Sequence, residues 1–113
     1  MSTSIRSNKE LSALTRSEQG ILVLFYAAWC PFCRRFLPVY ENLSLPKDQS
    51  CFRVEVDDID GCEDKFDIDV VPTVIYFKNG KITKRLDGKP GRGLDERQLL
   101  TLVDSCGLRK SNI

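Results

Sequence analysis

The chain has 113 residues, of which 42% are hydrophobic and 29% are charged, and its formal net charge at pH 7 is +1. This composition is typical of a single globular domain, and the near-neutral charge argues against nucleic-acid binding, which requires a surplus of basic side chains. The sequence contains no histidine, so Ser-His-Asp catalysis, Cys-His catalysis and histidine-ligated metals are excluded.

The sequence shows no pattern of export or of membrane insertion. No stretch approaches the roughly 20 apolar residues of a membrane-spanning helix, and the first ten residues are polar, unlike a signal peptide. The five cysteines are an odd number, which fits a reducing compartment better than a secreted domain held by disulfides. We therefore expect a cytoplasmic monomer with one domain over residues 1–113, flexible at residues 1–8 and 108–113.

The first 44 residues predict a helix, a strand and a second helix. A capping-box pattern at residues 7–10 predicts a helix that ends near Gly20. The continuous apolar run at residues 21–27 predicts a strand that is buried on both faces. Apolar residues at helical spacing then predict a helix over residues 31–44, which Pro38 should kink.

The second half of the chain alternates strand and helix patterns. Its apolar residues predict strands at residues 51–57, 73–77 and 82–86, and helices around residues 63–66 and 94–106. The segment Lys78-Asn79-Gly80-Lys81 is a strong hairpin signal. The resulting order, α-β-α-β-α-β-β-α, predicts one α/β unit that ends in a hairpin and a helix.

Cys30 and Cys33 form a Cys-Pro-Phe-Cys motif between the buried strand and the start of the following helix. Unpaired backbone amides and the helix dipole stabilise negative charge there, which favours thiolate chemistry at Cys30. Cys33 follows one turn later, within reach of a mixed disulfide formed at Cys30. The motif predicts a redox site; a pair of core cysteines or a half-site for zinc or an iron–sulfur cluster are the alternatives. The chain has no second Cys-x-x-Cys to complete such a cluster, so we expect no metal.

The chain resembles the thioredoxin family over residues 9–106. The resemblance rests on five features: the predicted strand that leads to the first cysteine at residues 21–30, Pro38 in the following helix, Val-Pro-Thr at residues 71–73, the hairpin at residues 77–80, and Gly88. These segments occur in the family's order and at its spacing.

The resemblance implies a thioredoxin fold, a central mixed β-sheet flanked by helices. It implies a protein-disulfide oxidoreductase without a cofactor, which reduces protein disulfides by dithiol exchange. Cys30 would be the exposed nucleophile and Cys33 the buried resolving thiol. It further implies a cis peptide bond before Pro72, protein disulfide substrates, and an electron donor such as a thioredoxin reductase. The implied substrate-binding residues are Trp29, Pro31, Phe32, Val71 and Pro72.

The sequence departs from the family pattern at the residues that surround the cysteines. Pro31-Phe32 replaces the usual Gly-Pro and is closer to the Cys-Pro-Tyr-Cys of glutaredoxins. Leu24 stands where the family has a buried aspartate, and Arg53 stands where it has a buried lysine. We expect Leu24, Arg34 and Arg53 to tune the reduction potential and proton affinity of the pair. Glu55, on the same strand face as Arg53, is a candidate substitute for the missing carboxylate.

Three other functions remain open at this point. Pro31-Phe32 and Leu24 favour a glutaredoxin-like or disulfide-isomerase-like activity. A thioredoxin-fold module that binds proteins with weak redox activity is an alternative of another class, and a dimer bridged by a metal cluster is a third. Of the remaining cysteines, we expect Cys51 and Cys106 to be buried and structural, and Cys62 to be exposed.

Overall fold

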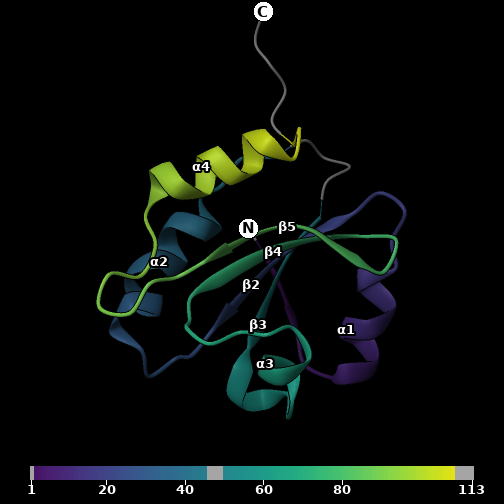
Figure 1. Ribbon diagram of the computed structural model, residues 1–113, viewed down its shortest axis with the longest axis horizontal. Helices are drawn as coiled ribbons and strands as arrows, with labels where there is room; N and C mark the ends of the chain where they lie inside the picture. Colours follow the sequence, from purple (N-terminus) through teal and green to yellow (C-terminus); the bar gives the residue numbers. More distant parts are fainter. Residues whose placement is uncertain (1, 46–49, 109–113) are drawn as a thin grey trace, which may run out of the picture.

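The computed structural model describes residues 2–45 and 50–108, which form a five-stranded mixed sheet covered by helices on both faces (Figure 1). The strands are β1 (Thr3–Ile5), β2 (Ile21–Tyr26), β3 (Ser50–Glu55), β4 (Thr73–Lys78) and β5 (Lys81–Asp87). The helices are α1 (Asn8–Thr15), α2 (Pro31–Glu41), α3 (Cys62–Lys65) and α4 (Glu96–Ser105), and a short 3-10 helix (Val56–Asp58) follows β3. The predicted α/β architecture is confirmed.

The sheet has the strand order β1-β3-β2-β4-β5. β1 and β2 both pair with β3 in parallel, whereas β4 is antiparallel to β2 and to β5. β2 therefore lies at the centre of the sheet, and its residues 21–25 are at most 2% exposed. This confirms the strand that the apolar run predicted to be buried on both faces.

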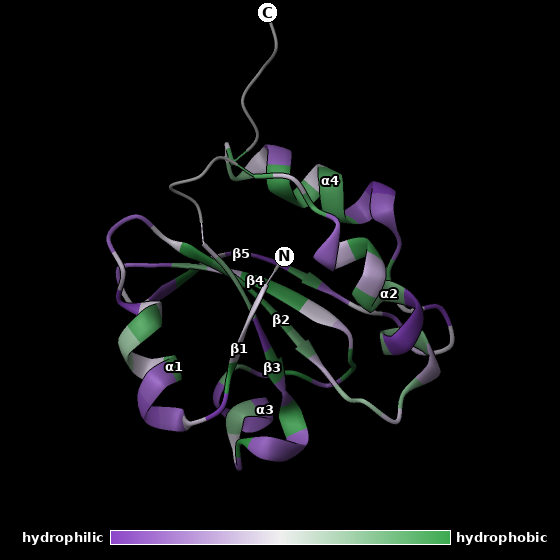
Figure 2. Cartoon of the chain, turned by 180° about the vertical axis from the view of Figure 1, so that it is seen from behind, coloured by the Kyte–Doolittle hydropathy of each residue, from purple (hydrophilic) through white to green (hydrophobic). Residues whose placement is uncertain are grey.

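The two faces of the sheet carry separate halves of the core. One half contains Leu11 of α1, Cys62 of α3 and three aromatic rings, those of Phe25, Phe66 and Phe77, whose centroids lie 5.1–6.4 Å apart. The other half contains the inward faces of α2 and α4. Figure 2 shows the hydrophobic residues concentrated in the central strands. Burial of this apolar surface is the main force that holds the helices on the sheet.

The first helix ends earlier than the sequence predicts. The hydroxyl of Ser7 accepts a hydrogen bond from the amide of Glu10 at 3.2 Å, as expected of a cap, but α1 ends at Thr15 rather than near Gly20. The turn of the β4–β5 hairpin explains this end. The amide of Gly80 donates to the carbonyl of Thr15 at 2.8 Å, and the amide of Asn79 donates to that of Ser17 at 3.0 Å. Carbonyls at the end of the helix are thus satisfied by the hairpin.

The N-terminal segment contains a strand that the sequence analysis does not predict. β1 lies within residues 1–8, pairs in parallel with β3, and includes Ile5, which is only 1% exposed. At three residues, this strand is too short to give a periodic sequence signal. At the other end, Leu108 is 6% exposed, and residues 109–113 of the expected flexible tail lie outside the described residues.

The remaining elements follow their sequence signals closely. Asn79 and Gly80 have positive φ angles of 53° and 78° in the β4–β5 turn, which confirms the predicted hairpin. α4 begins with a complete capping box between Asp95 and Gln98. Helix α2 ends at Glu41, three residues before the predicted end, and contains Pro38. None of the helices in the described parts of the chain is long and apolar enough to cross a membrane.

Candidate active site

Cys30 and Cys33 lie where the centre of the sheet meets a helix. Cys30 is the N-cap residue of α2, Pro31 occupies the first position of the helix, and Cys33 lies in its first turn. Both thiols are free. Cys30 is 6% exposed and Cys33 is 1% exposed, so the prediction of an exposed Cys30 is wrong for this dithiol form. Cys30 is nevertheless the more accessible thiol of the two.

The thiol of Cys33 is held in its protonated form by its surroundings. Burial raises its pKa to about 12, and the neighbouring Cys30 and Glu55 contribute in the same direction. A hydrogen bond from the amide of Ala27, 3.4 Å from Cys33 Sγ, opposes this shift without reversing it. Cys33 is therefore a thiol, not a thiolate, at neutral pH.

The segment that precedes β4 contains Val71 and Pro72 and lies next to Cys30. The peptide bond between Val71 and Pro72 is cis, as the family resemblance implied, and Cys30 Sγ lies 4.0 Å from the carbonyl oxygen of Val71. The amide of Gly88 donates to the carbonyl of Pro72 at 3.0 Å and joins the end of β5 to this segment. Backbone atoms of Val71 therefore lie beside the thiol of Cys30.

Trp29 is fixed at the surface by a residue that the sequence analysis did not single out. Its side chain is 68% exposed, and its indole N–H donates to Asp57 Oδ2 at 2.9 Å. Asp57 lies in the 3-10 helix that follows β3, and β3 runs parallel to β2 in the sheet. Because parallel neighbouring strands end at the same edge, the acidic residues that follow β3 could have been expected beside the Trp-Cys segment that follows β2.

Phe32 is half-buried between two groups on the other side of Cys30. The guanidinium of Arg35 lies 5.3 Å from the centroid of its ring, within the range of a cation–π contact. The backbone of Gly93 packs against the same side chain so closely that a Cβ at this position would lie 2.9 Å from Phe32 Cβ. The loop between β5 and α4 thus forms a wall of the site beside the first turn of α2 (Figure 1).

The three residues that were expected to tune the pair occupy different environments. Leu24 is fully buried in the core half under α2 and α4. The side chain of Arg34 is exposed. Arg53 donates to the carbonyl of Ser2 at 2.7 Å and lies 3.5 Å from Glu41. Because Glu41 ends α2, about 16 Å of helix separates it from Cys30. The structure therefore does not bring Arg53 to the cysteines.

Glu55 does lie beside the cysteine segment. Its Oε2 atom accepts a hydrogen bond from the amide of Ala28 at 2.8 Å, and its charge contributes to the raised pKa of Cys33. Burial raises the pKa of Glu55 itself, and the charges of Asp57 and Asp58 add to this effect. Cys33 and Glu55 therefore contact the consecutive amides of Ala27 and Ala28, respectively.

The other cysteines lie apart from this chemistry. Cys62 is 1% exposed and its Sγ lies 3.9 Å from the carbonyl of Val56, so the prediction of an exposed Cys62 is wrong. The turn at Gly61 directs the start of α3 toward the core. Cys51 and Cys106 are half-buried and pack against the core half under α2 and α4. Burial raises the pKa of Cys51 and of Cys62 to about 11 each.

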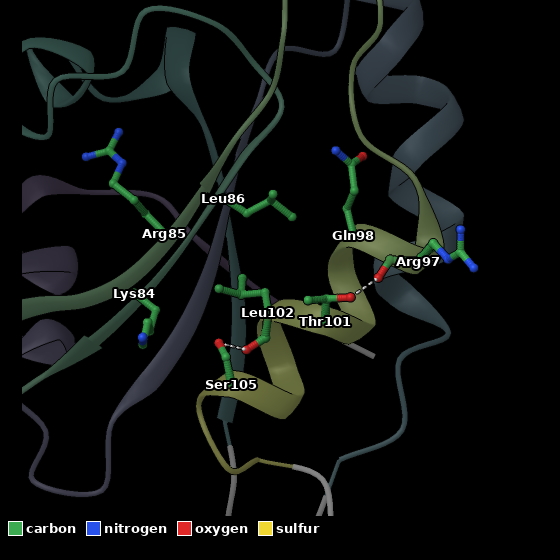
Figure 3. A pocket seen from close by; sticks show the side chains of 8 residues that line it. All are labelled: Lys84, Arg85, Leu86, Arg97, Gln98, Thr101, Leu102 and Ser105. Carbon is green, nitrogen blue, oxygen red and sulfur yellow. Dashed lines mark hydrogen bonds between the residues drawn. The ribbon is translucent and has the colours of Figure 1, made fainter.

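A separate hollow of about 390 Å³ lies between β5 and α4 (Figure 3). It is lined by Lys84, Arg85, Leu86, Arg97, Gln98, Thr101, Leu102 and Ser105. None of these residues is a cysteine or a carboxylate, so the hollow contributes no group to the redox pair. Within residues 2–45 and 50–108, no cluster of three or more His, Cys, Asp or Glu side chains is arranged to hold a metal ion.

Comparison with known proteins gives consistent matches over most of the chain. A family model described as "Thioredoxin" matches residues 3–101. A thioredoxin-like protein of Fusarium culmorum is 34% identical over 107 residues, which cover 91% of this chain and 88% of the relative. Thioredoxin of Mycoplasmoides gallisepticum is 33% identical over 94 residues, which cover 81% and 94%. The solution structure of oxidised Plasmodium falciparum thioredoxin superposes with a TM-score of 0.80 and 25% identity, covering 94% of this chain and 98% of that one.

Proposed function

Because this chain belongs to the thioredoxin family and is a thiol–disulfide oxidoreductase of the thioredoxin type, we propose that it reduces protein disulfides with Cys30 as the nucleophile and Cys33 as the resolving thiol. The observation that carries this assignment is the position of Cys30, which is the N-cap of α2 and faces the carbonyl of Val71. The start of a helix stabilises negative charge, whereas the buried Cys33 retains its proton.

The proposed reaction transfers two electrons from the dithiol to the substrate. The thiolate of Cys30 attacks one sulfur of the substrate disulfide, forms a mixed disulfide, and releases the other substrate sulfur as a thiolate that takes up a proton. Cys33 then loses its proton and attacks the sulfur of Cys30. The Cys30–Cys33 disulfide forms, and the second substrate sulfur leaves as a thiolate. The closeness of the two thiols, whose interaction contributes to the pKa of Cys33, supports this second step.

We assign substrate binding to the residues that border Cys30, namely Trp29, Pro31, Phe32, Val71 and Pro72. An extended substrate segment would pair with the backbone of Val71 in the manner of an added β-strand, while the exposed indole of Trp29 and the ring of Phe32 contact its side chains. An external electron donor, such as a thioredoxin reductase, would restore the dithiol. The cytoplasm remains the proposed compartment, although one relative is named as a chloroplastic thioredoxin of Oryza sativa.

The roles of the two cysteines are tested with single substitutions. Cys33→Ser should accumulate a covalent mixed disulfide with an oxidised protein substrate such as insulin, because Cys30 attacks but nothing resolves the product. Cys30→Ser should form no such adduct at neutral pH, because the raised pKa of Cys33 keeps it protonated. Mass spectrometry of the non-reduced mixture reads the adduct directly. An adduct with Cys30→Ser but not with Cys33→Ser would exchange the two roles.

The reduction potential of the Cys30–Cys33 pair distinguishes a reductase from an oxidant or isomerase. The Cys30–Cys33 pair is equilibrated with defined thiol buffers, and the fluorescence of Trp29 reports its redox state. A general reductase should have a reduction potential between about −280 and −230 mV. A value nearer about −180 to −120 mV would instead support an oxidant or isomerase. Rapid reduction of the disulfide by glutathione would favour the glutaredoxin-like activity that Pro31-Phe32 suggests. Partner binding that survives in Cys30→Ser/Cys33→Ser would favour the protein-binding module.

A further inference from the structure

The site has an acidic flank beside Trp29. Asp57 and Asp58 follow β3, and both are exposed. The hydrogen bond from the indole of Trp29 holds the carboxylate of Asp57 next to the substrate-binding surface. We refer to Asp57 and Asp58 as the acidic flank.

The site also has a basic flank beside Phe32, made of Arg35, Lys89 and Arg92. All three side chains are exposed, and the guanidinium of Arg35 lies over the ring of Phe32. Lys89 and Arg92 belong to the loop that packs on Phe32 through Gly93. The ion pairs found within the described parts of the chain, Arg53–Glu41 and Arg85–Asp87, include none of these cations.

The loop that carries two of the basic residues is held in place by its own backbone. The amides of Arg92 and Gly93 both donate to the carbonyl of Lys89 at 3.0 Å, and Lys89 and Gly93 form an isolated β-bridge. At the base of the loop, the amide of Gly88 donates to the carbonyl of Pro72 at 3.0 Å. Lys89 and Arg92 are therefore presented from a closed turn that is anchored to the cis-proline segment.

The sheet topology places the two flanks on opposite sides of the cysteines. Tyr26 is paired with Glu55, and Thr73 is paired with both Phe25 and Asp87, so the ends of β3, β2 and β5 and the start of β4 share one edge. Along that edge the order is β3, β2, β4, β5. With neighbouring strands about 4.8 Å apart, three spacings separate the ends of β3 and β5 by about 14 Å. This exceeds a Debye length of about 8 Å at physiological salt, so each flank acts on its own side of the substrate.

We propose that the acidic and basic flanks select substrate disulfides that have a basic segment on one side and an acidic segment on the other. The flanks favour one of the two possible orders of these segments along the substrate chain. This inference rests on the proposed reductase function and specifies its substrate class. In this proposal the backbone of Val71 holds the substrate segment in one direction, and the segment passes Cys30 from one flank to the other. Its charges then either match both flanks or oppose both. The net charge of the chain is only +1, so the selectivity comes from the local separation of charge, not from an overall field.

The test uses two oxidised synthetic peptides that contain the same Cys-x-x-Cys disulfide. One has two lysines before and two glutamates after the disulfide, and the other has these charges exchanged. The second-order rate constants for their reduction by the reduced protein are measured at physiological ionic strength. We expect a ratio of about tenfold between the two, as several weak surface charge pairs together allow, and this ratio should fall toward one at high salt.

Two double variants with the same change of net charge locate the effect. Lys89→Glu/Arg92→Glu reverses charges on the basic flank and should reduce the ratio to about twofold or invert it. Lys78→Glu/Lys81→Glu alters exposed residues at the β4–β5 turn, at the far end of the sheet from the cysteines, and should leave the ratio unchanged. Because each ratio compares two peptides on one variant, changes in intrinsic thiol reactivity cancel.

A ratio near one in the unaltered protein would overturn the proposal, as would a ratio that Lys89→Glu/Arg92→Glu leaves intact. A loss of the ratio in both double variants would also overturn it, because the effect would then come from net charge. The neutral disulfide bis(2-hydroxyethyl) disulfide separates this test from that of the proposed function. If this compound and both peptides fail to oxidise the Cys30–Cys33 pair, the reductase function itself is wrong. If it reacts and the peptides react equally, only the charge selectivity is wrong.

Discussion

At the scale of single residues, the chemistry of the pair depends on the proton that Cys33 carries. In the proposed reaction this thiol, with a pKa of about 12, must give up its proton before it attacks the mixed disulfide. Leu24, fully buried in the core half under α2 and α4, has no group that could influence this step by charge. Glu55 does have such a group, because its carboxylate accepts a hydrogen bond from the amide of Ala28 and its charge raises the pKa of Cys33. Glu55 therefore couples electrostatically to the thiol of Cys33.

The substitution Glu55→Gln should lower the pKa of Cys33. The negative charge of Glu55 disfavours the thiolate, so its removal makes ionisation easier. The pKa can be followed in the reduced protein by nuclear magnetic resonance of the Cβ carbon of Cys33 as a function of pH. Asp58→Asn is the matched control, because Asp58 is an exposed carboxylate three residues along the chain and is not among the main causes of the raised pKa of Cys33. A pKa that stays the same or rises in Glu55→Gln would contradict the coupling.

At the scale of elements, the site is assembled from loops that are tied to one another by backbone contacts. The cis-proline segment is tied to the end of β5 by the hydrogen bond from Gly88 to Pro72. A Cβ atom at position 88 would overlap the carbonyl oxygen of Pro72, and a backbone atom cannot rotate away as a side chain does. The lack of a side chain at Gly88 is thus what allows the two segments to approach.

The substitution Gly88→Ala should therefore disturb both stability and activity. Overpacking at a fixed contact costs about 1–3 kcal/mol, and displacement of Val71 from Cys30 should slow the reduction of protein disulfides. Urea unfolding and insulin reduction measure the two effects. Thr83→Ala, at an exposed position of β5, serves as the control and should cost no more than about 0.5 kcal/mol. Unchanged stability and activity in Gly88→Ala would show that the segments separate without cost.

At the scale of the whole molecule, the sequence predicted the elements whose side chains have a regular period, and missed the contacts between distant elements. The buried strand β2 and the Asn79-Gly80 turn have strong local signals, and both were confirmed. The strand β1 has only three residues and no such signal. The contact of Trp29 with Asp57 depends on the parallel pairing of β2 with β3, which local periodicity does not specify. Sequence position alone also suggested a role for Arg53 at the cysteines.

Arg53 instead takes part in a contact that joins three elements of the fold. Glu41 at the end of α2 accepts hydrogen bonds from the backbone amide and the hydroxyl of Ser2, which precedes β1, and it pairs with Arg53 of β3 at 3.5 Å. Burial opposes the ionisation of Glu41, but the hydrogen bonds from Ser2 and the charge of Arg53 outweigh it and lower the pKa of the carboxyl. The contact thus holds the edge strand to the end of α2.

The stability that this contact contributes should depend on pH. A carboxyl whose pKa is lower in the folded chain stabilises the fold above the pKa of the unfolded chain and loses this contribution as the pH falls through its folded pKa. Glu41→Gln should therefore cost about 0.5 kcal/mol in the free energy of unfolding at neutral pH, as expected for a partly exposed pair, and less at pH values near 3. Urea unfolding at the two pH values measures the difference, with Glu63→Gln, an exposed carboxylate of α3, as the control. An equal or larger cost at the acidic pH would show that Glu41 acts through packing, since protonation removes only the contribution of its charge.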